Sequence, residues 1–338
     1  MSMRKKSYAA VGLAVIAHLW RYHRKLAGFP ERFSYEEMSE PLLDASRHQI
    51  FVEDEGDSNA TNITRRAISV MATPQPKEAW GGKTIVLVHG FKMSVKIWTL
   101  MWSDLRQRGH RVIAPDLAGH GESDPLENLS PEALASDLRR VLDFFEVSEG
   151  VLVGHSVGGL IALQYLLDNP AHAAQRLPLG FACIACTAGN MNELAGGVFS
   201  NWNKVLLSSG FFDFLMRWQW AAELIVAKRF ANPNMAAVRT AIEAMRSGSS
   251  NWALRNMSDV AWQVDLHPRI PGGLSIPSVL VVGALDDQHP HPSVSEALKA
   301  NLSATGMLRK YVVLQDVGHF IPLQRPEEAV DAIEQIWS

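Results

Sequence analysis

Six short apolar runs without alternating polar positions stand out along the chain. They cover residues 84–88, 112–114, 151–153, 181–186, 279–282 and 311–314. Continuous apolarity over so few residues is typical of strands that are covered on both faces, as in parallel sheets. Two earlier segments, 48–53 and 64–72, alternate instead, and the polar stretch 54–62 between them predicts a turn. We therefore expect two strands of a meander, followed by six buried strands.

Segments in which apolar residues recur at the helical interval lie between these runs. Residues 131–145 show this spacing, with Glu132 and Asp137 turned outward. Residues 326–337 begin with Pro326 and two glutamates, which suits the first turn of a helix and the positive end of its dipole. Alternation of strands and helices predicts an α/β fold with a doubly wound, mostly parallel sheet.

One long interval, residues 189–270, contains no buried-strand pattern. After Pro233, apolar residues from Met235 to Met245 recur at helical spacing. Aromatic residues crowd the same interval, namely Trp202, Phe211, Phe212, Phe214, Trp218, Trp220, Trp252 and Trp262. The pattern predicts a helical lid that is inserted between two strands of the sheet. Aromatic residues at helical spacing serve packing as often as they line a pocket, and both interpretations stay open.

Basic residues bracket an apolar stretch near the N-terminus. Three of them precede residues 7–20, three more follow by Lys25, and the first acidic residue is Glu31. The stretch is shorter than the roughly 20 residues that span a bilayer, and no small-residue cleavage site follows it. It fits a short anchor or interfacial helix, an uncleaved targeting signal, or a helix on the protein's own surface. We expect membrane association through this segment; the alternative is a cytoplasmic protein.

The pattern divides the chain into four parts. Residues 1–43 form the N-terminal basic and apolar segment with a connecting arm. Residues 44–188 form the first part of the α/β core, residues 189–270 the lid, and residues 271–338 the second part of the core. We see no internal repeat and no low-complexity tract. Oligomeric state does not follow from the sequence.

Charge and cysteine content narrow the classes of partner. A formal net charge of −3 and a pI near 6.5 argue against a phosphate-binding surface, so nucleic acid is not expected as a partner. The two cysteines, Cys183 and Cys186, have a C-x-x-C spacing. They fall in the apolar run 181–186, where positions three apart on a strand point to opposite faces. We therefore expect two buried core thiols, without a shared metal or a disulfide.

The strongest chemical signal is Gly154-His155-Ser156-Val157-Gly158. It follows the expected strand 151–153 and opens an apolar helix over 159–167. A tight strand–turn–helix of this kind exposes the serine hydroxyl above the carboxyl edge of the sheet, and the helix N-terminus favours developing negative charge. The two glycines are expected because the turn brings backbone too close for a Cβ. Ser156 is the candidate nucleophile.

A serine nucleophile needs a base and an acid that orients the base. His319 follows the last expected strand, so its loop lies at the same sheet edge as Ser156. The carboxylate comes from Asp286 or Asp287, directly after the strand 279–282, and we favour Asp286. The chain order serine, aspartate, histidine is the one expected for this kind of sheet.

Other histidines have weaker claims on chemistry. His89 and His155 flank functional turns and are expected to be structural. His289 and His291 stand in a His-Pro-His-Pro segment that lacks a third obvious metal ligand, so no metal site is expected.

The oxyanion of an acyl transfer needs two backbone donors, each about 3 Å away. One is the N–H of Val157, because that residue follows the nucleophile. The other should come from the loop after the strand Thr84–Val88, where Gly90 permits a bend and Phe91 offers its N–H.

Taken together, the chain resembles the α/β-hydrolase superfamily, in its lid-bearing group of esterases, lipases and epoxide hydrolases. The resemblance covers about residue 48 to the C-terminus and rests on five motifs in a fixed order. They are His89-Gly90-Phe91, Ala114-Pro115-Asp116-Leu117-Ala118-Gly119-His120-Gly121-Glu122-Ser123, the 154–158 turn, Gly283–Asp286 and Gly318-His319-Phe320. The extension 1–43 and the long segment 56–78 depart from the family pattern, which leaves the subfamily and its substrate open.

The resemblance implies a function for these residues. Ser156, Asp286 and His319 would form the triad, and Phe91 and Val157 the oxyanion hole. Dehalogenases and epoxide hydrolases of the superfamily use an aspartate at the turn, so Ser156 argues against both. We expect a serine hydrolase that cleaves a carboxylic ester of lipophilic character, through an acyl-enzyme and without a metal or organic cofactor.

Several alternatives use the same motifs. The triad would also suit an acyltransferase, a carbon–carbon hydrolase or a cofactor-free haloperoxidase-like enzyme. From another class, relatives of this fold include small-molecule receptors in which slow hydrolysis serves signalling. Nothing in the motifs separates these. An interaction protein without activity is disfavoured, because every triad candidate is present.

Overall fold

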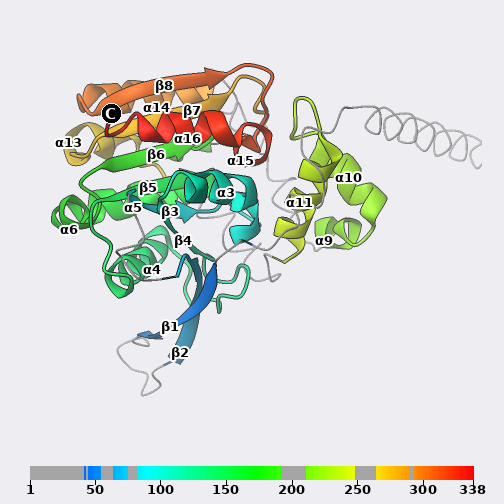
Figure 1. Cartoon of the computed structure of the whole chain (residues 1–338), viewed down its shortest axis with the longest axis horizontal. Coiled ribbons are helices and arrows are strands. Elements are labelled where there is room, and N and C mark those ends of the chain that lie inside the picture. The colour runs from blue at the N-terminus through cyan, green and yellow to red at the C-terminus, as the bar shows by residue number, and fades with distance from the viewer. Residues whose placement is uncertain are drawn as a thin grey trace, which may run out of the picture.

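The computed structural model describes residues 42, 45–54, 64–74, 82–191, 211–247, 264–288 and 293–338. An eight-stranded sheet runs through the molecule in the order β1-β2-β4-β3-β5-β6-β7-β8 (Figure 1). The strands are β1 Ser46–Asp54, β2 Thr64–Ala72, β3 Thr84–Val88, β4 Arg111–Pro115, β5 Gly150–His155, β6 Gly180–Ile184, β7 Ser278–Gly283 and β8 Leu308–Leu314. All eight strands that the sequence predicts are therefore confirmed.

The sheet is parallel except at one end. β1 and β2 form an antiparallel hairpin, and only the last residues of β2, from Val70 to Ala72, pair with β4. The neighbours from β4 through β8 are parallel. The α/β class and the mostly parallel sheet are thus as predicted. β8 differs from the other expected buried strands because it is the last strand of the sheet, and its residues are half-buried or exposed.

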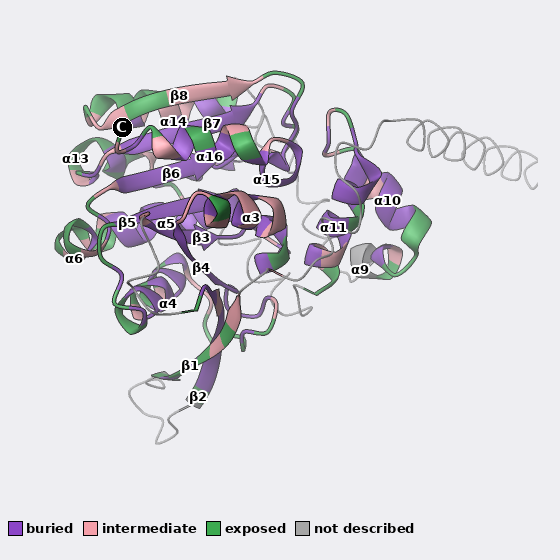
Figure 2. Ribbon diagram, in the orientation of Figure 1, coloured by how far each residue is buried: buried purple, intermediate pink, exposed green. Residues whose placement is uncertain are grey.

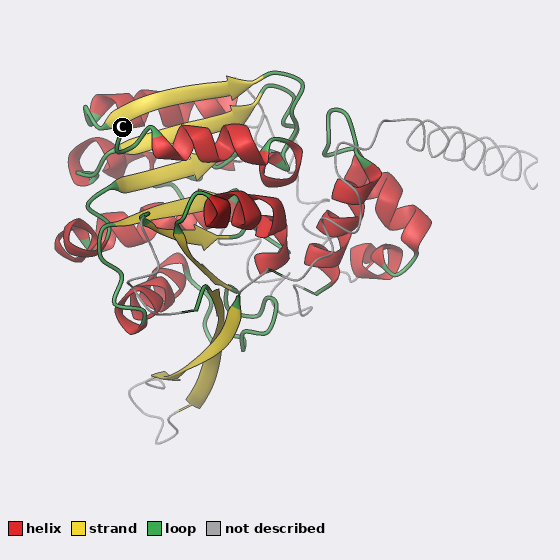
Figure 3. Ribbon diagram, viewed as in Figure 1, coloured by secondary structure: helices red, strands yellow, loops and turns green. Residues whose placement is uncertain are grey.

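Helices cover both faces of the sheet (Figure 3). The helices of the described residues are η2 Val95–Trp98, α3 Thr99–Gln107, α4 Pro131–Phe144, α5 Val157–Asp168, α6 Pro170–Arg176, α9 Phe211–Met216, α10 Gln219–Ala227, α11 Met235–Arg246, η3 His267–Arg269, α13 Ile270–Gly273, α14 Ser293–Ala304, α15 Ile321–Gln324 and α16 Pro326–Glu334. Buried side chains of α4, α5 and α14 share one core cluster, and those of α3, α15 and α16 share the other.

The strand side chains divide between these two clusters in alternation. In β3, Ile85 and Leu87 belong to the α3 side, and Val86 and Val88 to the α5 side. All four are fully buried, as the unbroken purple of the central strands shows in Figure 2. The continuous apolar runs in the sequence are explained by this double cover, because neither face of these strands meets water.

Helix α4 shows how the local sequence fixes an element and where it deviates from the expectation. Ser130 caps the helix by accepting a hydrogen bond from the Ala133 N–H at 3.1 Å, and Pro131 follows at the first turn. The prediction that Asp137 turns outward was wrong. Its carboxylate is buried and forms an ion pair with the buried guanidinium of Arg66 on β2, so a cross-element partner overrides the polar preference for solvent.

The helices α9, α10 and α11, here called the inserted helices, stand between β6 and β7 in the chain and lie beyond the carboxyl ends of the parallel strands (Figure 1). The chain leaves and re-enters the core at one place, where Gly189 forms a β-bridge with Asp265 and the Leu266 N–H donates to the Ala188 carbonyl oxygen at 2.8 Å. The amphipathic helix expected over 235–245 is α11, which Asn234 caps. Trp202, Trp252 and Trp262 lie outside the described residues.

The N-terminal segment 1–43 lies, apart from Leu42, outside the described residues, so its expected membrane role stays a prediction. Among the residues that are described, no helix combines the length and the apolarity that a bilayer crossing requires. His289 and His291 fall in another gap of the description.

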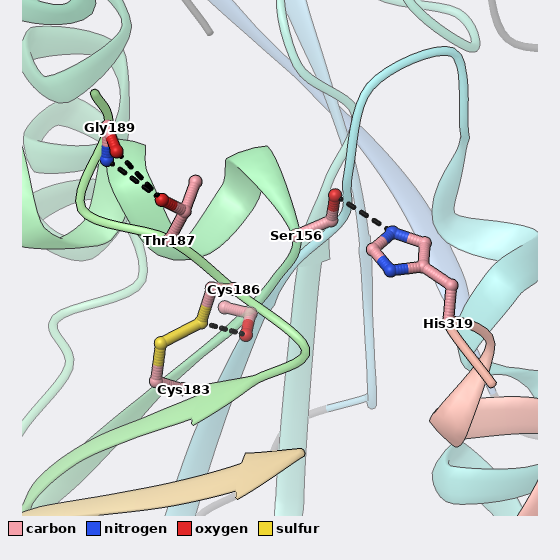
Figure 4. Close-up of a disulfide and its surroundings, with 7 residues drawn as sticks. Ser156, Cys183, Cys186, Thr187, Gly189 and His319 are labelled. Carbon is pink, nitrogen blue, oxygen red and sulfur yellow. Dashed lines mark hydrogen bonds between the residues drawn. A yellow bond between two sulfur atoms is a disulfide. The ribbon is translucent and has the colours of Figure 1, made fainter. Parts of the chain in front are cut away.

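The expectation for the two cysteines was half right. Cys183 and Cys186 are both buried, but they form a disulfide (Figure 4). The prediction of two thiols on opposite faces assumed that the strand continues to residue 186. It ends at Ile184, and Ala185 adopts a left-handed φ of 48°. The chain therefore turns, and the Cα atoms of the two cysteines come within 5.7 Å on the α5 side of the sheet.

Candidate active site

A tight turn between β5 and α5 places Ser156 at the carboxyl end of the sheet. Ser156 has φ 56° and ψ −128°, in the left-handed half of φ that few residues with a Cβ adopt. The flanking glycines are needed for space, as the sequence predicts. A Cβ on Gly154 would lie 2.4 Å from the Gly159 Cα, and one on Gly158 would lie 2.2 Å from the Val88 carbonyl oxygen. The strained turn presents the serine hydroxyl at the start of a helix.

Three side chains from distant parts of the chain meet at this turn. The Ser156 Oγ lies 3.0 Å from the His319 Nε2, and the His319 Nδ1 lies 2.8 Å from the Asp286 Oδ2. Figure 4 shows the serine hydroxyl directed at the imidazole. All three residues are buried, with exposed fractions of 7%, 5% and 6% for Ser156, His319 and Asp286. Burial strengthens the interaction among them because little water screens it.

The two candidate carboxylates have different partners. Asp286 bonds to the imidazole and also accepts the Gln288 backbone N–H at 2.8 Å, which fixes its orientation. Asp287 points elsewhere: its carboxylate pairs with the Arg229 guanidinium at 2.8 Å and is half exposed. The structure brings Asp286, and not Asp287, to His319.

His155 supports the loop of His319 from inside the core. Its Nε2 lies 3.0 Å from the His319 carbonyl oxygen, so this nitrogen carries the proton and donates. Its ring is fully buried and packs against the rings of His319 and Trp98, with centroids at 5.0 and 6.2 Å. The expected structural role of His155 agrees with these contacts.

The loop after β3 passes directly over the nucleophile. A Cβ on Gly90 would lie 2.9 Å from the Ser156 Cβ and 3.2 Å from the His155 Nδ1, so the absence of a side chain allows the approach. The loop then turns back, with Lys92 at φ 57° and the Met93 N–H donating to the Gly90 carbonyl oxygen at 3.2 Å. Phe91 stands in this turn, as the assignment of its N–H to an oxyanion hole requires.

Two buried histidines tie this loop to the segment that follows β4. The His89 Nε2 accepts the Leu117 N–H at 3.0 Å while its Nδ1 donates to the Gly90 carbonyl oxygen at 2.8 Å. The His120 Nε2 accepts the Lys92 N–H at 3.2 Å. Each ring therefore has one nitrogen that accepts, which requires a neutral imidazole. His120 belongs to the motif of residues 114–123, whose pattern alone predicted no role for this histidine.

Asp116 is buried beside the same segment, and the sequence pattern predicted no role for it either. Its buried carboxylate accepts the Val95 N–H at 3.0 Å and the Glu122 N–H at 3.2 Å. Gly121 has φ 53°, and a Cβ there would lie 2.1 Å from the Asp116 Cγ. The aspartate-to-glycine spacing of the motif thus encodes a carboxylate-centred turn beside the oxyanion loop.

Comparison with known proteins places this arrangement in a family. The sequence model of the Alpha/beta hydrolase family matches residues 85–332 of the 338. The chain belongs to the alpha/beta hydrolase family. The match spans β3 through α16, so it includes the Ser156 turn and the loops of Asp286 and His319. The resemblance seen in the sequence is confirmed at the level of the superfamily.

Curated relatives of this alpha/beta hydrolase align with it over limited stretches. An uncharacterised protein of Mycobacterium tuberculosis is 39% identical over 93 residues, which is 27% of either chain. The AB hydrolase superfamily protein YisY of Bacillus subtilis is 34% identical over 99 residues, 29% of this chain and 37% of that one. The alignment thus covers between a quarter and two fifths of these relatives.

Solved structures align over much more of the hydrolase. An esterase from Thermogutta terrifontis has a TM-score of 0.64 at 21% identity, covering 85% of this chain and 97% of its own. A bromoperoxidase from Bacillus anthracis has 0.66 at 18%, covering 86% and 99%. A bacterial membrane phospholipase A has 0.66 at 20%, covering 99% and 98%. At such identities the likeness shows the shared fold.

The histidines of the hydrolase site differ from solvent-exposed histidine in proton affinity. Burial lowers the pKa of His89 to about 4 and the pKa of His120 to about 3. Burial also lowers the pKa of His319 to about 3, and Arg229 adds to this effect while Asp287 opposes it. At neutral pH the His319 ring is therefore uncharged, which is the form that accepts a proton from a hydroxyl.

We predict that Gly90→Ala lowers kcat/KM for an ester by about 100-fold, because the new methyl group would push the oxyanion loop away from Ser156. The measurement is steady-state hydrolysis together with a thermal melt. Gly272→Ala is the matched control, since a Cβ there has nothing within 4 Å and should leave the rate unchanged. Equal rates for the two variants would contradict the proposed place of this loop.

We also predict that the hydrolase loses stability in mild acid. The unfolded chain binds protons at its histidines near their ordinary pKa of 6.5, whereas folded His89 and His120 stay neutral down to about 4 and about 3. The unfolded state therefore binds more protons below pH 6.5, and each residue lowers the free energy of unfolding by about 1.4 kcal/mol per pH unit. Urea denaturation at pH 7, 6 and 5 measures the slope. His120→Gln should make it shallower, and an unchanged slope would refute the assignment.

Proposed function

We propose that this protein is a serine hydrolase that cleaves a carboxylic ester of lipophilic character through an acyl-enzyme on Ser156. The observation that carries the proposal is the buried chain of contacts from the Ser156 hydroxyl to the His319 imidazole to the Asp286 carboxylate, at 3.0 and 2.8 Å. A nucleophile bonded to a base that is itself bonded to an acid is the arrangement that nucleophilic acyl transfer requires.

In the first half of the proposed cycle, the Ser156 Oγ attacks the carbonyl carbon of the ester while the neutral His319 Nε2 takes the hydroxyl proton. The Asp286 carboxylate stabilises the resulting imidazolium and keeps the Nδ1 proton in place. The tetrahedral oxyanion is held by the N–H groups of Phe91 and Val157, next to the positive end of α5.

In the second half, the imidazolium gives its proton to the leaving alkoxide, and the alcohol departs. Water then enters, His319 removes its proton, and the hydroxide attacks the acyl carbon. Collapse of the second tetrahedral species returns the proton to Ser156 and releases the carboxylic acid. No metal or organic cofactor enters this cycle.

The lipophilic character of the substrate is inferred from the inserted helices, which we take as part of a lid over residues 189–270. Phe214 on α9, Trp218 just before α10 and Trp220 on α10 are exposed, at 53%, 54% and 52%. Large aromatic side chains that stay in water favour contact with a lipid-like molecule or surface. The structural likeness to esterases and to a membrane phospholipase A supports the same class.

We further propose that the N-terminal segment 1–43 holds the enzyme at a membrane surface. The apolar stretch 7–20 has basic residues on both sides, which suits anionic headgroups. Deletion of residues 1–29 should move the protein from the membrane fraction to the supernatant without lowering its rate on a water-soluble ester. A truncated protein that still sediments with membranes would contradict this role.

The test of the whole proposal is labelling with a fluorophosphonate probe, followed by hydrolysis of p-nitrophenyl esters of increasing acyl length. We expect stoichiometric labelling at Ser156, and a kcat/KM that rises from acetate toward medium acyl chains by up to about fourfold for each methylene that becomes buried. Absence of labelling would overturn the serine mechanism. A kcat/KM that falls steadily beyond acetate would overturn only the lipophilic substrate.

A further inference from the structure

The residues that follow α10 contact the loop of His319 through the backbone. The Arg229 carbonyl oxygen accepts the His319 N–H at 3.0 Å. The approach is close enough that a Cβ on Gly318 would lie 2.2 Å from that oxygen. Residues 228–231, here called the α10 tail, therefore pack directly against the loop that carries the proposed base.

A second contact joins the same two segments. The Gln324 Oε1 accepts the Ala231 N–H of the α10 tail at 3.2 Å and the Gly318 N–H at 3.4 Å. The aromatic rings of Phe230 and Phe320 pack beside these bonds, with their centroids 5.0 Å apart. Because Phe320 follows His319, a shift of the α10 tail would be transmitted to the backbone of the proposed base.

The side chain of Arg229 reaches the loop of the acid as well. Its guanidinium pairs with the Asp287 carboxylate at 2.8 Å, and the amide of Gln288 lies against the same guanidinium. Asp287 directly follows Asp286, the partner of the His319 ring. The backbone of Arg229 thus binds the loop of the base, and its side chain binds the loop of the acid. Arg229 belongs to the α10 tail, which directly follows one of the inserted helices.

Within the described part of the chain, the groups with charge or titratable character that face His319 include Asp286, His155, Arg229 and Asp287. Asp286 bonds to its Nδ1, and the ring of His155 packs at 5.0 Å. Arg229 and Asp287 form the ion pair beside it and act on its proton affinity in opposite directions, Arg229 by repelling the imidazolium and Asp287 by attracting it. On its own loop, Asp316 is exposed to solvent.

We infer that the Arg229–Asp287 pair is a positioning device for His319, which couples the placement of the inserted helices to the proposed base and balances the charge around its ring. The inference rests on the proposed function, because it concerns the same histidine. Neither residue touches the reacting atoms, so both act through His319. A lid that moves with the α10 tail would then change the geometry and the proton affinity of the base together.

The Arg229–Asp287 pair predicts shifts of the His319 pKa in opposite directions in the two single variants. A simple loss of structure would not produce opposite shifts. Arg229→Met removes the repulsion and leaves the Asp287 charge unbalanced, so the His319 pKa rises and the acid limb of the pH profile moves to higher pH. Asp287→Asn leaves the Arg229 charge unbalanced, so the limb moves to lower pH. Both side chains are 36–50% exposed and are screened by water, which limits each shift to a few tenths of a pH unit. The double variant should return close to the wild-type profile.

The readout is the rate of fluorophosphonate labelling at Ser156 after a brief jump from pH 7 to each lower pH, so that the rate is read before acid unfolds the protein. This rate depends on the serine and its base and needs no natural substrate. Arg229→Lys keeps the positive charge and should restore most of the wild-type profile. Arg239→Met is the matched control, because Arg239 also lies on the inserted helices and pairs with the Glu223 carboxylate at 3.2 Å, within α10 and α11. Its profile should coincide with that of the wild type.

Each result decides one of the two proposals. Opposite shifts that cancel in the double variant, and that shrink in 1 M salt, support the positioning device. Wild-type protein that labels normally, with limbs that coincide or move in the same direction in both single variants, overturns it and leaves the serine hydrolase intact. Wild-type protein that does not label at all overturns the proposed function, and the inference with it.

Discussion

Replacement of Ser156 by alanine is expected to lower kcat/KM for ester hydrolysis by at least about 10⁴-fold and to abolish fluorophosphonate labelling. Alanine removes only the hydroxyl that lies 3.0 Å from the His319 Nε2. The melting temperature should change little, because both residues carry a Cβ at the same left-handed φ of 56°. Steady-state kinetics on a p-nitrophenyl ester, with a parallel melt, make the measurement.

The control for this variant is Ser303→Ala, which removes an exposed hydroxyl on α14 and should leave both rate and labelling at wild-type values. A Ser156→Ala protein that is folded and still hydrolyses esters within tenfold of the wild-type rate would mean that another group performs the attack. The triad assignment would then be wrong as a whole.

The second large effect is expected for Asp286→Asn, with a loss of about 10³- to 10⁴-fold in kcat. The amide no longer stabilises the imidazolium, and it can donate a hydrogen bond to the His319 Nδ1, which would hold the ring in the wrong tautomer. KM should change much less than kcat, because Asp286 is buried behind the histidine and its contact is with the ring.

Asp316→Asn is the matched control, since it makes the same chemical change on the loop of His319 at an exposed position, and asparagine tolerates the left-handed φ of 56° there. It should retain most of the activity. If Asp286→Asn also retained most of its kcat, the Asp286 carboxylate would have no role in catalysis. The imidazole would then need another source of stabilisation.

The sheet and its carboxyl-edge loops could be predicted because their causes are local. A strand covered on both faces, such as Thr84–Val88, must be apolar at every position, and that pattern is visible without any partner. The turn around Ser156 is also local, because Gly154 and Gly158 are required by backbone atoms at the same bend and at the end of β3. Asp286 and His319 each follow a strand that is parallel to the strand before Ser156, so all three residues could be placed at the same edge of the sheet.

What the sequence did not reveal depends either on pairs that are distant in the chain or on the backbone conformation of a single residue. Asp137 on α4 reads as a solvated residue until Arg66 of β2 is placed opposite it. The disulfide depended on a single backbone conformation, the left-handed φ at Ala185, which no hydrophobic pattern encodes. The contact between Arg229 and the His319 loop joins the inserted helices to the last loop of the core, 90 residues later by numbering, and had no signal in either segment alone.

The backbone conformation of Ser156 restricts which amino acids can occupy that position. Threonine carries the same hydroxyl, but its branched Cβ would crowd the backbone at a φ of 56°, a conformation that β-branched residues almost never adopt. Cysteine and aspartate are unbranched at that carbon and would fit the same bend. The turn therefore limits which nucleophile can occupy this position. The primary alcohol of serine, the thiol of cysteine and the carboxylate of aspartate fit, and the secondary alcohol of threonine does not.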